Sequence, residues 1–218
     1  MLPWLPENVS SYGGQIDSLF LLIFWITTIV FVAVQATLVV FLFKYRYRPG
    51  RKATYTHGNN TLEIAWTIAP SIILVVLALL SRATWDEIKA EMPPVDVSVR
   101  VYAKQFNWDF IYPGPDGVFD TADDLTLENE LNVPVDKVVK LEMLSRDVIH
   151  SLFMPHLRFK QDMVPGRQID GWFKATKTGE FEIPCAELCG FGHSGMLGHL
   201  KVYSAPDYAA WVAERWSN

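Results

Sequence analysis

The segment CAELCGFGHSGM, residues 185–196, brings together side chains that bind soft metal ions. Cys185 and Cys189 are the only two cysteines among 218 residues, and His193 and Met196 follow within seven residues of the second cysteine. Thiolate, imidazole and thioether groups are the ligand set that proteins use for copper. The spacing leaves two structural alternatives open: a disulfide between the cysteines, or a closed zinc site completed by a distant histidine.

Copper accounts for more of this segment than either alternative does. A disulfide leaves the histidine and the methionine without a role, and zinc leaves Met196 unused because thioether sulfur is a soft ligand that copper takes far more often. A blue-copper site needs one cysteine, two histidines and one methionine. The second cysteine of this loop allows two copper ions to share both sulfur atoms, with one imidazole for each ion. A second histidine must then come from upstream.

His150 is the upstream candidate. It lies in RDVIHSLFMP, residues 146–155, at the end of a strand-like segment before a loop that contains proline. We interpret the other histidines as structural or solvated, because His57 falls in a basic loop, His156 follows a proline and His199 starts a predicted strand. The predicted ligand set is therefore His150 together with the four side chains of the cysteine-containing loop.

Short β-strands are the elements that must position these ligands. Val95, Val97, Val99 and Val101 alternate with other residues, which is the period-two pattern of a half-buried strand. Further short segments separated by turn signals predict an antiparallel sandwich; they cover residues 137–145, 168–175, 179–184 and 198–204. The last segment, APDYAAWVAERW, predicts a closing helix with its aromatic residues on one face.

Two long apolar segments precede this domain. Residues 18–43 contain no Asp, Glu, Lys or Arg over 26 positions, and residues 64–81 form a second uncharged run of 18. As helices, runs of roughly 20 apolar residues span the ~30 Å core of a bilayer. Because no Lys or Arg precedes the first run, it does not resemble a cleaved signal peptide. The pattern predicts a transmembrane hairpin.

Charge orients this hairpin. KYRYRPGRK, residues 44–52, carries five basic residues, so the positive-inside rule places this loop in the cytoplasm and both termini outside. From Glu91 onward the chain has 19 acidic and 12 basic residues, which argues against nucleic-acid binding and fits either attraction of a basic partner or solubility alone equally well. The expected organisation is an outer N-terminal segment (1–17), a first transmembrane helix (18–43), a cytoplasmic loop (44–61), a second transmembrane helix (62–82), a linker (83–94) and the outer domain (95–218).

An acidic loop stands apart from the ligand segments. PGPDGVFDTADD, residues 113–124, carries four aspartates: Asp116, Asp120, Asp123 and Asp124. Carboxylate oxygens at such spacing can hold calcium, although the segment does not match the EF-hand pattern. Two other interpretations stay open, namely a solvated hairpin insertion and a docking patch for a basic partner.

Together, the motifs resemble one known family over the whole chain. D-V-x-H-S around His150 and C-x-E-x-C-G-x-x-H-x-x-M over residues 185–196 are similar to the CuA motifs of cytochrome c oxidase subunit II. LEIAWTIAPSIIL (62–74) resembles the second-span signature E-x-x-W-T-x-x-P of that family, and KQDMVPGR (160–167) resembles its K-x-D-x-x-P-G-R loop. The resemblance implies a two-helix transmembrane hairpin followed by an all-β, cupredoxin-like Greek-key sandwich with a C-terminal helix.

The resemblance also implies roles for the metal ligands. Cys185 and Cys189 would bridge two copper ions, His150 and His193 would be terminal ligands, and Met196 would be a weak ligand to one copper. Shared thiolates would spread one electron over two metals and lower the reorganisation on electron transfer. The glycines of the loop would let it wrap closely around the centre.

Four more residues take their expected roles from the resemblance. Glu187 would offer its backbone carbonyl to the other copper and its carboxylate to a magnesium ion shared with subunit I. Glu63 would lie at the entrance of a proton pathway into subunit I, although its position alone fits an end-cap equally well. Phe106 stands where the family usually has the tryptophan at which electrons enter, and Trp108 remains from that pattern. Phe106 keeps a flat contact without an indole N–H, so the docking surface is expected to differ.

The expected function is that of the electron-accepting subunit of a terminal haem–copper oxidase. A c-type cytochrome, alone or within a donor complex, would reduce the copper centre, and haem in subunit I would receive the electrons for oxygen reduction to water coupled to proton pumping. The chain has no C-x-x-C-H haem motif. Expected partners are subunit I, the other oxidase subunits and the lipid bilayer of a bacterial plasma membrane or mitochondrial inner membrane, with the outer domain on the periplasmic or outer side.

Three other functions fit fewer of these residues. A quinol oxidase subunit II has lost its copper, which conflicts with the intact ligand set. A copper carrier or assembly module needs no residue such as Glu63 at the mouth of a span. A nitrous-oxide-reducing enzyme would need a large catalytic domain in the same chain.

Overall fold

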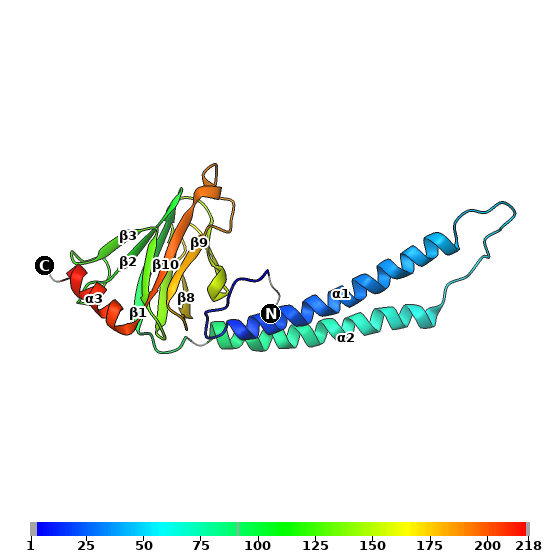
Figure 1. Ribbon diagram of the computed structural model, residues 1–218, viewed down its shortest axis with the longest axis horizontal. Coiled ribbons are helices and arrows are strands. Elements are labelled where there is room, and N and C mark those ends of the chain that lie inside the picture. Colours follow the sequence, from blue (N-terminus) through cyan, green and yellow to red (C-terminus); the bar gives the residue numbers. More distant parts are fainter. Residues whose placement is uncertain (1–3, 91, 217–218) are drawn as a thin grey trace. The chain divides into compact units, whose positions relative to one another are not determined.

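The computed structural model describes residues 4–90 and 92–216, which divide into two compact units (Figure 1). One unit is a helical hairpin, residues 15–87. The other unit, called the β unit below, joins the segment up to Gly14 with the chain from Ile88 onward.

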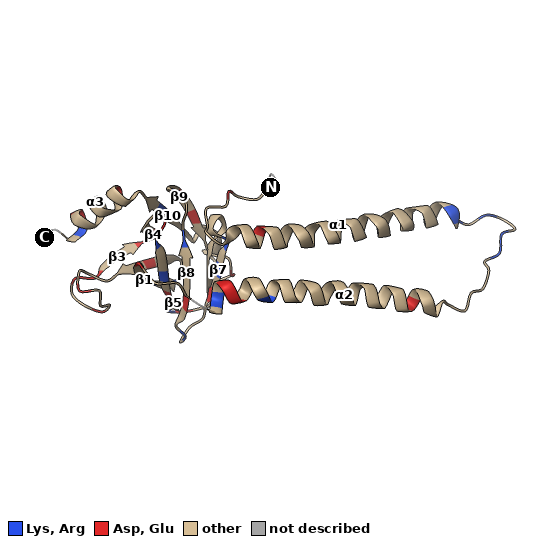
Figure 2. Cartoon of the chain, turned by 90° about the horizontal axis from the view of Figure 1, so that it is seen from below, with Lys and Arg blue, Asp and Glu red and all other residues tan. Residues whose placement is uncertain are grey.

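Two long helices, α1 (Gly13–Lys44) and α2 (Asn60–Trp85), form the hairpin, and a π-helical turn (Asp86–Ala90) follows α2. Both helices are long and apolar enough to cross a membrane, and their apolar stretches are not buried within the protein. Figure 2 shows that the charged residues of both helices lie towards the helix ends. A core helix of a soluble protein would bury such a surface, so these helices require an apolar environment outside the chain.

The first turn of α2 contains Glu63. Asn59 caps this helix, because its side-chain oxygen accepts a hydrogen bond from the N–H of Leu62 at 3.1 Å. A carboxylate in the first turn is favoured by the positive end of the helix dipole. This position by itself gives Glu63 a structural reason to be there.

The β unit is a sandwich of two sheets with an added two-stranded ribbon. The first sheet has the order β3-β2-β1-β5-β8, the second has the order β4-β10-β9, and β6 pairs with β7. The strands are β1 (Val97–Lys104), β2 (Asn107–Tyr112), β3 (Leu125–Glu128), β4 (Glu130–Pro134), β5 (Val138–Ser145), β6 (His150–Met154), β7 (Phe159–Met163), β8 (Ile169–Lys174), β9 (Gly179–Pro184) and β10 (Leu197–Tyr203). The closing helix α3 (Ala205–Trp216) covers the predicted segment.

The sandwich core follows from the period-two patterns. Val99 and Val101 of β1 are fully buried, as the alternation of valines predicts. β5 and β10 contribute buried side chains at every second position in the same way. Such alternation places one face of each sheet against the other and fixes the register of the strands.

The prediction of an antiparallel sandwich is wrong for two strand pairs. β1 pairs with β5 in parallel, and β4 pairs with β10 in parallel. After β3 in the first sheet the chain crosses to β4 in the second sheet and then returns to β5 in the first, so strands that pair can be far apart in the sequence and run in the same direction. A period-two pattern identifies a strand but carries no information about the direction of its partner.

The segment ahead of α1 is part of the β unit. Ser10 forms an antiparallel bridge with Ala175, just beyond the edge strand β8. Val9 and Tyr12 are buried, and the ring of Tyr12 meets the ring of Trp172 edge-on with 5.3 Å between centroids. The sequence predicted only an outer segment here, because a single short pairing leaves no repeated pattern.

The acidic loop joins β2 to β3, which pair antiparallel, so the prediction of a hairpin insertion is confirmed. Asp120 forms an ion pair with Arg100 at 2.8 Å. Asp123 accepts a hydrogen bond from the hydroxyl of Thr121, and Asp124 accepts one from the backbone N–H of Asp120. These carboxylates have partners within the protein, and calcium binding by the loop stays a prediction.

Candidate metal centre

The loop of residues 185–196 connects β9 to β10, and two sets of contacts position it. At its base, the backbone N–H of Cys185 donates a hydrogen bond to the carbonyl oxygen of Met196 at 3.1 Å. Cys185 also forms an isolated bridge with Leu152 of β6. Since His150 is the first residue of β6, this bridge brings the upstream histidine beside the loop.

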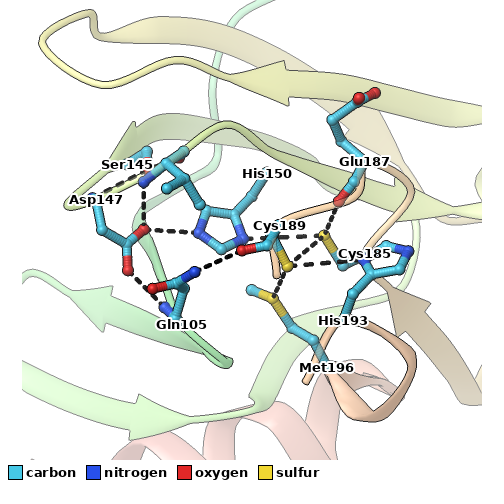
Figure 3. A network of polar contacts seen from close by, with 10 residues as sticks. Gln105, Ser145, Asp147, His150, Cys185, Glu187, Cys189, His193 and Met196 are labelled. Carbon is cyan, nitrogen blue, oxygen red and sulfur yellow. Dashed lines mark hydrogen bonds and ion pairs between the residues drawn. The ribbon is translucent and has the colours of Figure 1, made fainter. Parts of the chain in front are cut away.

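The five predicted side-chain ligands come together in the β unit (Figure 3). The Sγ atoms of Cys185 and Cys189 lie 3.9 Å apart, which is about twice the roughly 2 Å bond of a disulfide. Nδ1 of His150 lies 3.9 Å from Sγ of Cys185, and Nδ1 of His193 lies 3.6 Å from Sγ of Cys189. Sδ of Met196 lies 3.8 Å from Sγ of Cys189. Each imidazole therefore faces one of the two sulfur atoms.

Glu187 contributes its backbone rather than its side chain to this cluster. Its carbonyl oxygen lies 3.3 Å from Sγ of Cys185. Its carboxylate is exposed and points away from the sulfur atoms (Figure 3). The two groups of one residue are thus separated in the way that the resemblance implies.

Asp147 is the hydrogen-bond partner that orients the ring of His150. The Nε2 atom of His150 lies 2.8 Å from Oδ1 of Asp147. Partial burial works against ionisation, but hydrogen bonds from His150 and from the backbone N–H groups of Gln105 and Val148 lower the pKa of Asp147. The carboxylate is therefore an acceptor at neutral pH, so Nε2 of His150 donates to it and Nδ1 is the ring nitrogen that faces Sγ of Cys185.

The thiol of Cys189 lies in surroundings that disfavour its ionised form. Burial, followed by the proximity of Cys185, raises the pKa of Cys189 to about 11. A cation that binds both sulfur atoms removes this cost and displaces the thiol protons. A cation bound here would therefore favour the thiolate form of Cys189.

The donor set decides which ion fits. Among the described residues, His150, Cys185 and Cys189 are the buried group of metal-ligating side chains that lie within reach of one another. Two thiols, two imidazoles and a thioether suit copper, whereas zinc would leave Met196 unused. The 3.9 Å between the sulfur atoms also disfavours a disulfide. The residues present fit copper best.

Phe106 packs against the ligand loop. A Cβ atom added at Gly192 would lie 2.5 Å from the ring of Phe106, so only glycine permits this approach. Gly190 has a φ of +136°, a conformation that side chains rarely adopt. Gly195, in contrast, borders open space. The loop therefore needs two of its three glycines, one for close contact and one for its backbone conformation.

The remaining predicted residues occupy three different places. Phe106 is 36% exposed, whereas Trp108 is fully buried behind His150. Of these two aromatic residues, Phe106 is the one that a partner can touch. Glu63 belongs to the helical hairpin and not to the β unit.

Sequence reasoning assigned no role to two residues that hold the ligands. Asp147 lies inside the D-V-x-H-S motif, so its three-residue spacing from His150 was a usable signal. Gln105 carried no signal, because its contacts join positions 42 and 84 residues away.

The fold and the site define a membrane protein that carries a cupredoxin-like domain with a candidate copper centre. Two family models match the chain: the transmembrane domain of cytochrome c oxidase subunit II over residues 4–83, and its periplasmic domain over residues 110–202. The chain belongs to the cytochrome c oxidase subunit II family. It is therefore a component of a haem–copper oxidase, and the family implies copper binding and partnership with subunit I.

Individual relatives support this assignment. The alternative cytochrome c oxidase subunit 2 of Bradyrhizobium diazoefficiens is 30% identical, with 98% of this chain and 84% of the relative covered. Cytochrome c oxidase subunit 2 of Cereibacter sphaeroides is 33% identical, with 88% and 73% covered. The crystal structure of the periplasmic domain of subunit II of cytochrome oxidase from Bradyrhizobium japonicum is 33% identical, with a TM-score of 0.51, 57% of this chain and 96% of that chain covered.

Proposed function

We propose that this chain is the subunit through which electrons enter a terminal haem–copper oxidase. A c-type cytochrome is the donor, a dinuclear copper centre in the β unit is the acceptor, and haem in subunit I receives the electrons for reduction of oxygen to water coupled to proton pumping. The observation that carries this proposal is the pair of buried sulfur atoms at 3.9 Å, each facing the Nδ1 atom of one histidine.

In this proposal Cys185 and Cys189 hold both copper ions, His150 and His193 hold one each, and Met196 is a weak ligand. The backbone carbonyl of Glu187 completes the set. Copper bound by these ligands supplies a one-electron acceptor and donor. The protein contributes a buried site on rigid strands, which keeps the ligands in place when the charge changes.

The exposed carboxylate of Glu187 supports a second metal role. It points away from the sulfur atoms and so is available to an ion outside the cluster (Figure 3). We assign this carboxylate to a magnesium ion shared with subunit I. Hard oxygen ligands of this kind suit magnesium and do not compete for copper.

Glu63 is proposed as the entrance of a proton pathway into subunit I. A carboxylate beside a membrane span is costly unless it has a function or lies at the helix end. Glu63 lies in the first turn of α2, so it meets the requirement that a carboxylate beside a membrane span lie at the helix end. This end of the proposed span follows the basic loop. Mutation separates the two roles, as described in the Discussion.

The proposed location is a bacterial plasma membrane or a mitochondrial inner membrane, with the β unit on the periplasmic or outer side. The five basic residues of KYRYRPGRK support a cytoplasmic loop between the helices. The segment ahead of α1 packs within the β unit, which agrees with placing both on one side.

Copper counting tests the proposal. The full chain is loaded with copper in detergent, copper ions per chain are counted, and the electron paramagnetic resonance spectrum is recorded. Two ions with one unpaired electron shared between them are expected. A single ion with a localised spectrum would instead identify a mononuclear carrier, and a chain that binds no copper would fit a quinol oxidase subunit.

A further inference from the structure

Gln105 touches the ligand loop from outside it. Its side-chain Nε2 donates a hydrogen bond to the carbonyl oxygen of Cys189 at 2.6 Å (Figure 3). A Cβ atom added at Gly190 would lie 2.7 Å from the same Nε2. The glycine that follows Cys189 therefore leaves the space in which the amide sits.

The backbone of Gln105 holds the other side of the centre. Its N–H donates to Oδ2 of Asp147 at 2.7 Å, while Oδ1 of the same carboxylate accepts from Nε2 of His150 at 2.8 Å. One residue thus connects the histidine of β6 with a cysteine of the loop. The chain of contacts runs His150, Asp147, Gln105, Cys189.

Gln105 itself sits on a firm support. Together with Phe106 it forms the turn between β1 and β2, which are paired up to Lys104 and Asn107 on either side. The ring of Phe106 lies against Gly190 and Gly192 of the ligand loop. A short turn between paired strands has little conformational freedom. Gln105 can therefore hold the carboxylate of Asp147 and the carbonyl of Cys189 in fixed positions.

We infer that Gln105 is a positioning residue of the copper centre, which holds the Cys189 side of the ligand loop in register with His150. This inference rests on the proposed copper function. Hydrogen bonds to groups next to metal ligands commonly change metal affinity about 10- to 100-fold when removed. The side-chain amide of Gln105 acts on the loop, and its backbone N–H acts on the carboxylate that orients the histidine.

The test uses the full chain and the variant Gln105→Met, which keeps the length of the side chain and the backbone N–H but removes the amide. Copper loss to a chelator is expected to become about 10- to 100-fold faster. In the metal-free protein, alkylation of the cysteines by iodoacetamide is expected to become about five- to tenfold faster, the factor for loss of one hydrogen bond. The paramagnetic resonance spectrum of the loaded variant is expected to change as well.

Two variants control this experiment. Gln168→Met makes the same change at an exposed position that bonds only locally with Asp170, and it should behave as the wild type. In Gln105→Glu a carboxylate replaces the amide donor and faces the carbonyl oxygen of Cys189. Both copper loss and cysteine alkylation should therefore be faster in Gln105→Glu than in Gln105→Met. Urea unfolding of each variant shows whether the changes are local to the loop.

The outcomes separate this inference from the proposed function. If the wild type binds copper and Gln105→Met matches Gln168→Met within twofold in both rates and in its spectrum, the positioning role is wrong and the copper function stands. If the wild type binds no copper, the proposed function fails. The alkylation rates of the metal-free chains still decide whether Gln105 holds the loop.

Discussion

The ring of Trp108 meets the ring of His150 edge to face, with 6.1 Å between centroids and 66° between planes. Both side chains are fully buried. The indole Nε1 has no hydrogen-bond partner among the described residues. The candidate centre therefore has a buried aromatic wall on the His150 side, to which Trp108 contributes its packing.

Trp108→Ala and Trp108→Phe should differ widely in stability. Truncation to alanine leaves a cavity and should cost about 3–5 kcal/mol in the free energy of unfolding. Phenylalanine keeps an aromatic ring against His150. It also removes an indole N–H whose burial without a partner costs about 1–3 kcal/mol. The loss in free energy of unfolding for Trp108→Phe should therefore be less than half of the loss for Trp108→Ala. Urea unfolding of the metal-free protein measures both. Equal costs would show that the indole N–H has an acceptor.

Cys185→Ser should abolish the dinuclear signature. A hydroxyl is a poor ligand for copper in place of a thiolate, so the variant should bind at most one copper with a localised paramagnetic resonance spectrum. Reduction by a c-type cytochrome should be lost in the assembled oxidase. Turnover at the wild-type rate in this variant would contradict the assignment of the centre.

Glu63→Gln should slow steady-state oxygen reduction by the assembled oxidase while the donor still reduces copper at the normal rate. The reason is that glutamine keeps the shape and the helix-end position but cannot carry a proton. Glu87→Gln, near the other end of the hairpin where Glu87 bonds with Gln15, is the matched control. Normal oxygen reduction in Glu63→Gln would leave this residue as an end-cap.

Salt should weaken binding of the donor. The chain from Glu91 onward carries 19 acidic and 12 basic residues, so a basic cytochrome is attracted to it. Between about 10 and 150 mM salt the screening length falls from roughly 30 to 8 Å, and KM for the donor should rise over that range. A KM that does not respond to salt would indicate an apolar or permanently attached donor.

The stability of the β unit should depend on Glu130 at acid pH. A hydrogen bond from Asn132, and then one from Lys201, lowers the pKa of Glu130 below its ordinary value of 4.5. Because the pKa is lower in the folded state, the stabilisation is present above pH 4.5 and is lost as the pH falls through the folded-state value.

Glu130→Gln should therefore lower the free energy of unfolding at pH 7 and have a smaller effect at pH 3. The effect should be about 1 kcal/mol or less, because the pair is partly exposed and screened by solvent. Urea unfolding at pH 7, 4.5 and 3 measures it, with Glu182→Gln on β9 as the control for loss of one charge. An equal effect at all three pH values would exclude the ionised carboxylate as its cause.

The sequence was sufficient to predict which side chains come together in the β unit and much of the scaffold. Cysteine, histidine and methionine at close spacing limit the possible chemistry, and His150 followed from the need for a second imidazole. Long uncharged runs and alternating valines predicted the hairpin and β1 because those signals are repeated over many residues. Family resemblance added Glu187, whose carbonyl no spacing rule could identify.

Other features were beyond the sequence for physical reasons. The parallel pairing of β4 with β10 depends on which sheet each strand joins, and the residues of a single strand do not encode it. The contacts of Gln105 and the bridge between Ser10 and Ala175 are single long-range interactions. A single contact leaves no periodicity, so it appears only when the chain is folded.

The bridge between Ser10 and Ala175 also sets an order of events during synthesis. The ribosome makes the segment ahead of α1 long before it makes β8, and the two lie 165 positions apart at this bridge. Val9 and Tyr12 can therefore be buried only after the ribosome has made both helices and most of the strands of the sandwich. Contacts so distant in sequence are slow to form, so the segment ahead of α1 can close the edge of β8 only after the helices and most of the strands have been made.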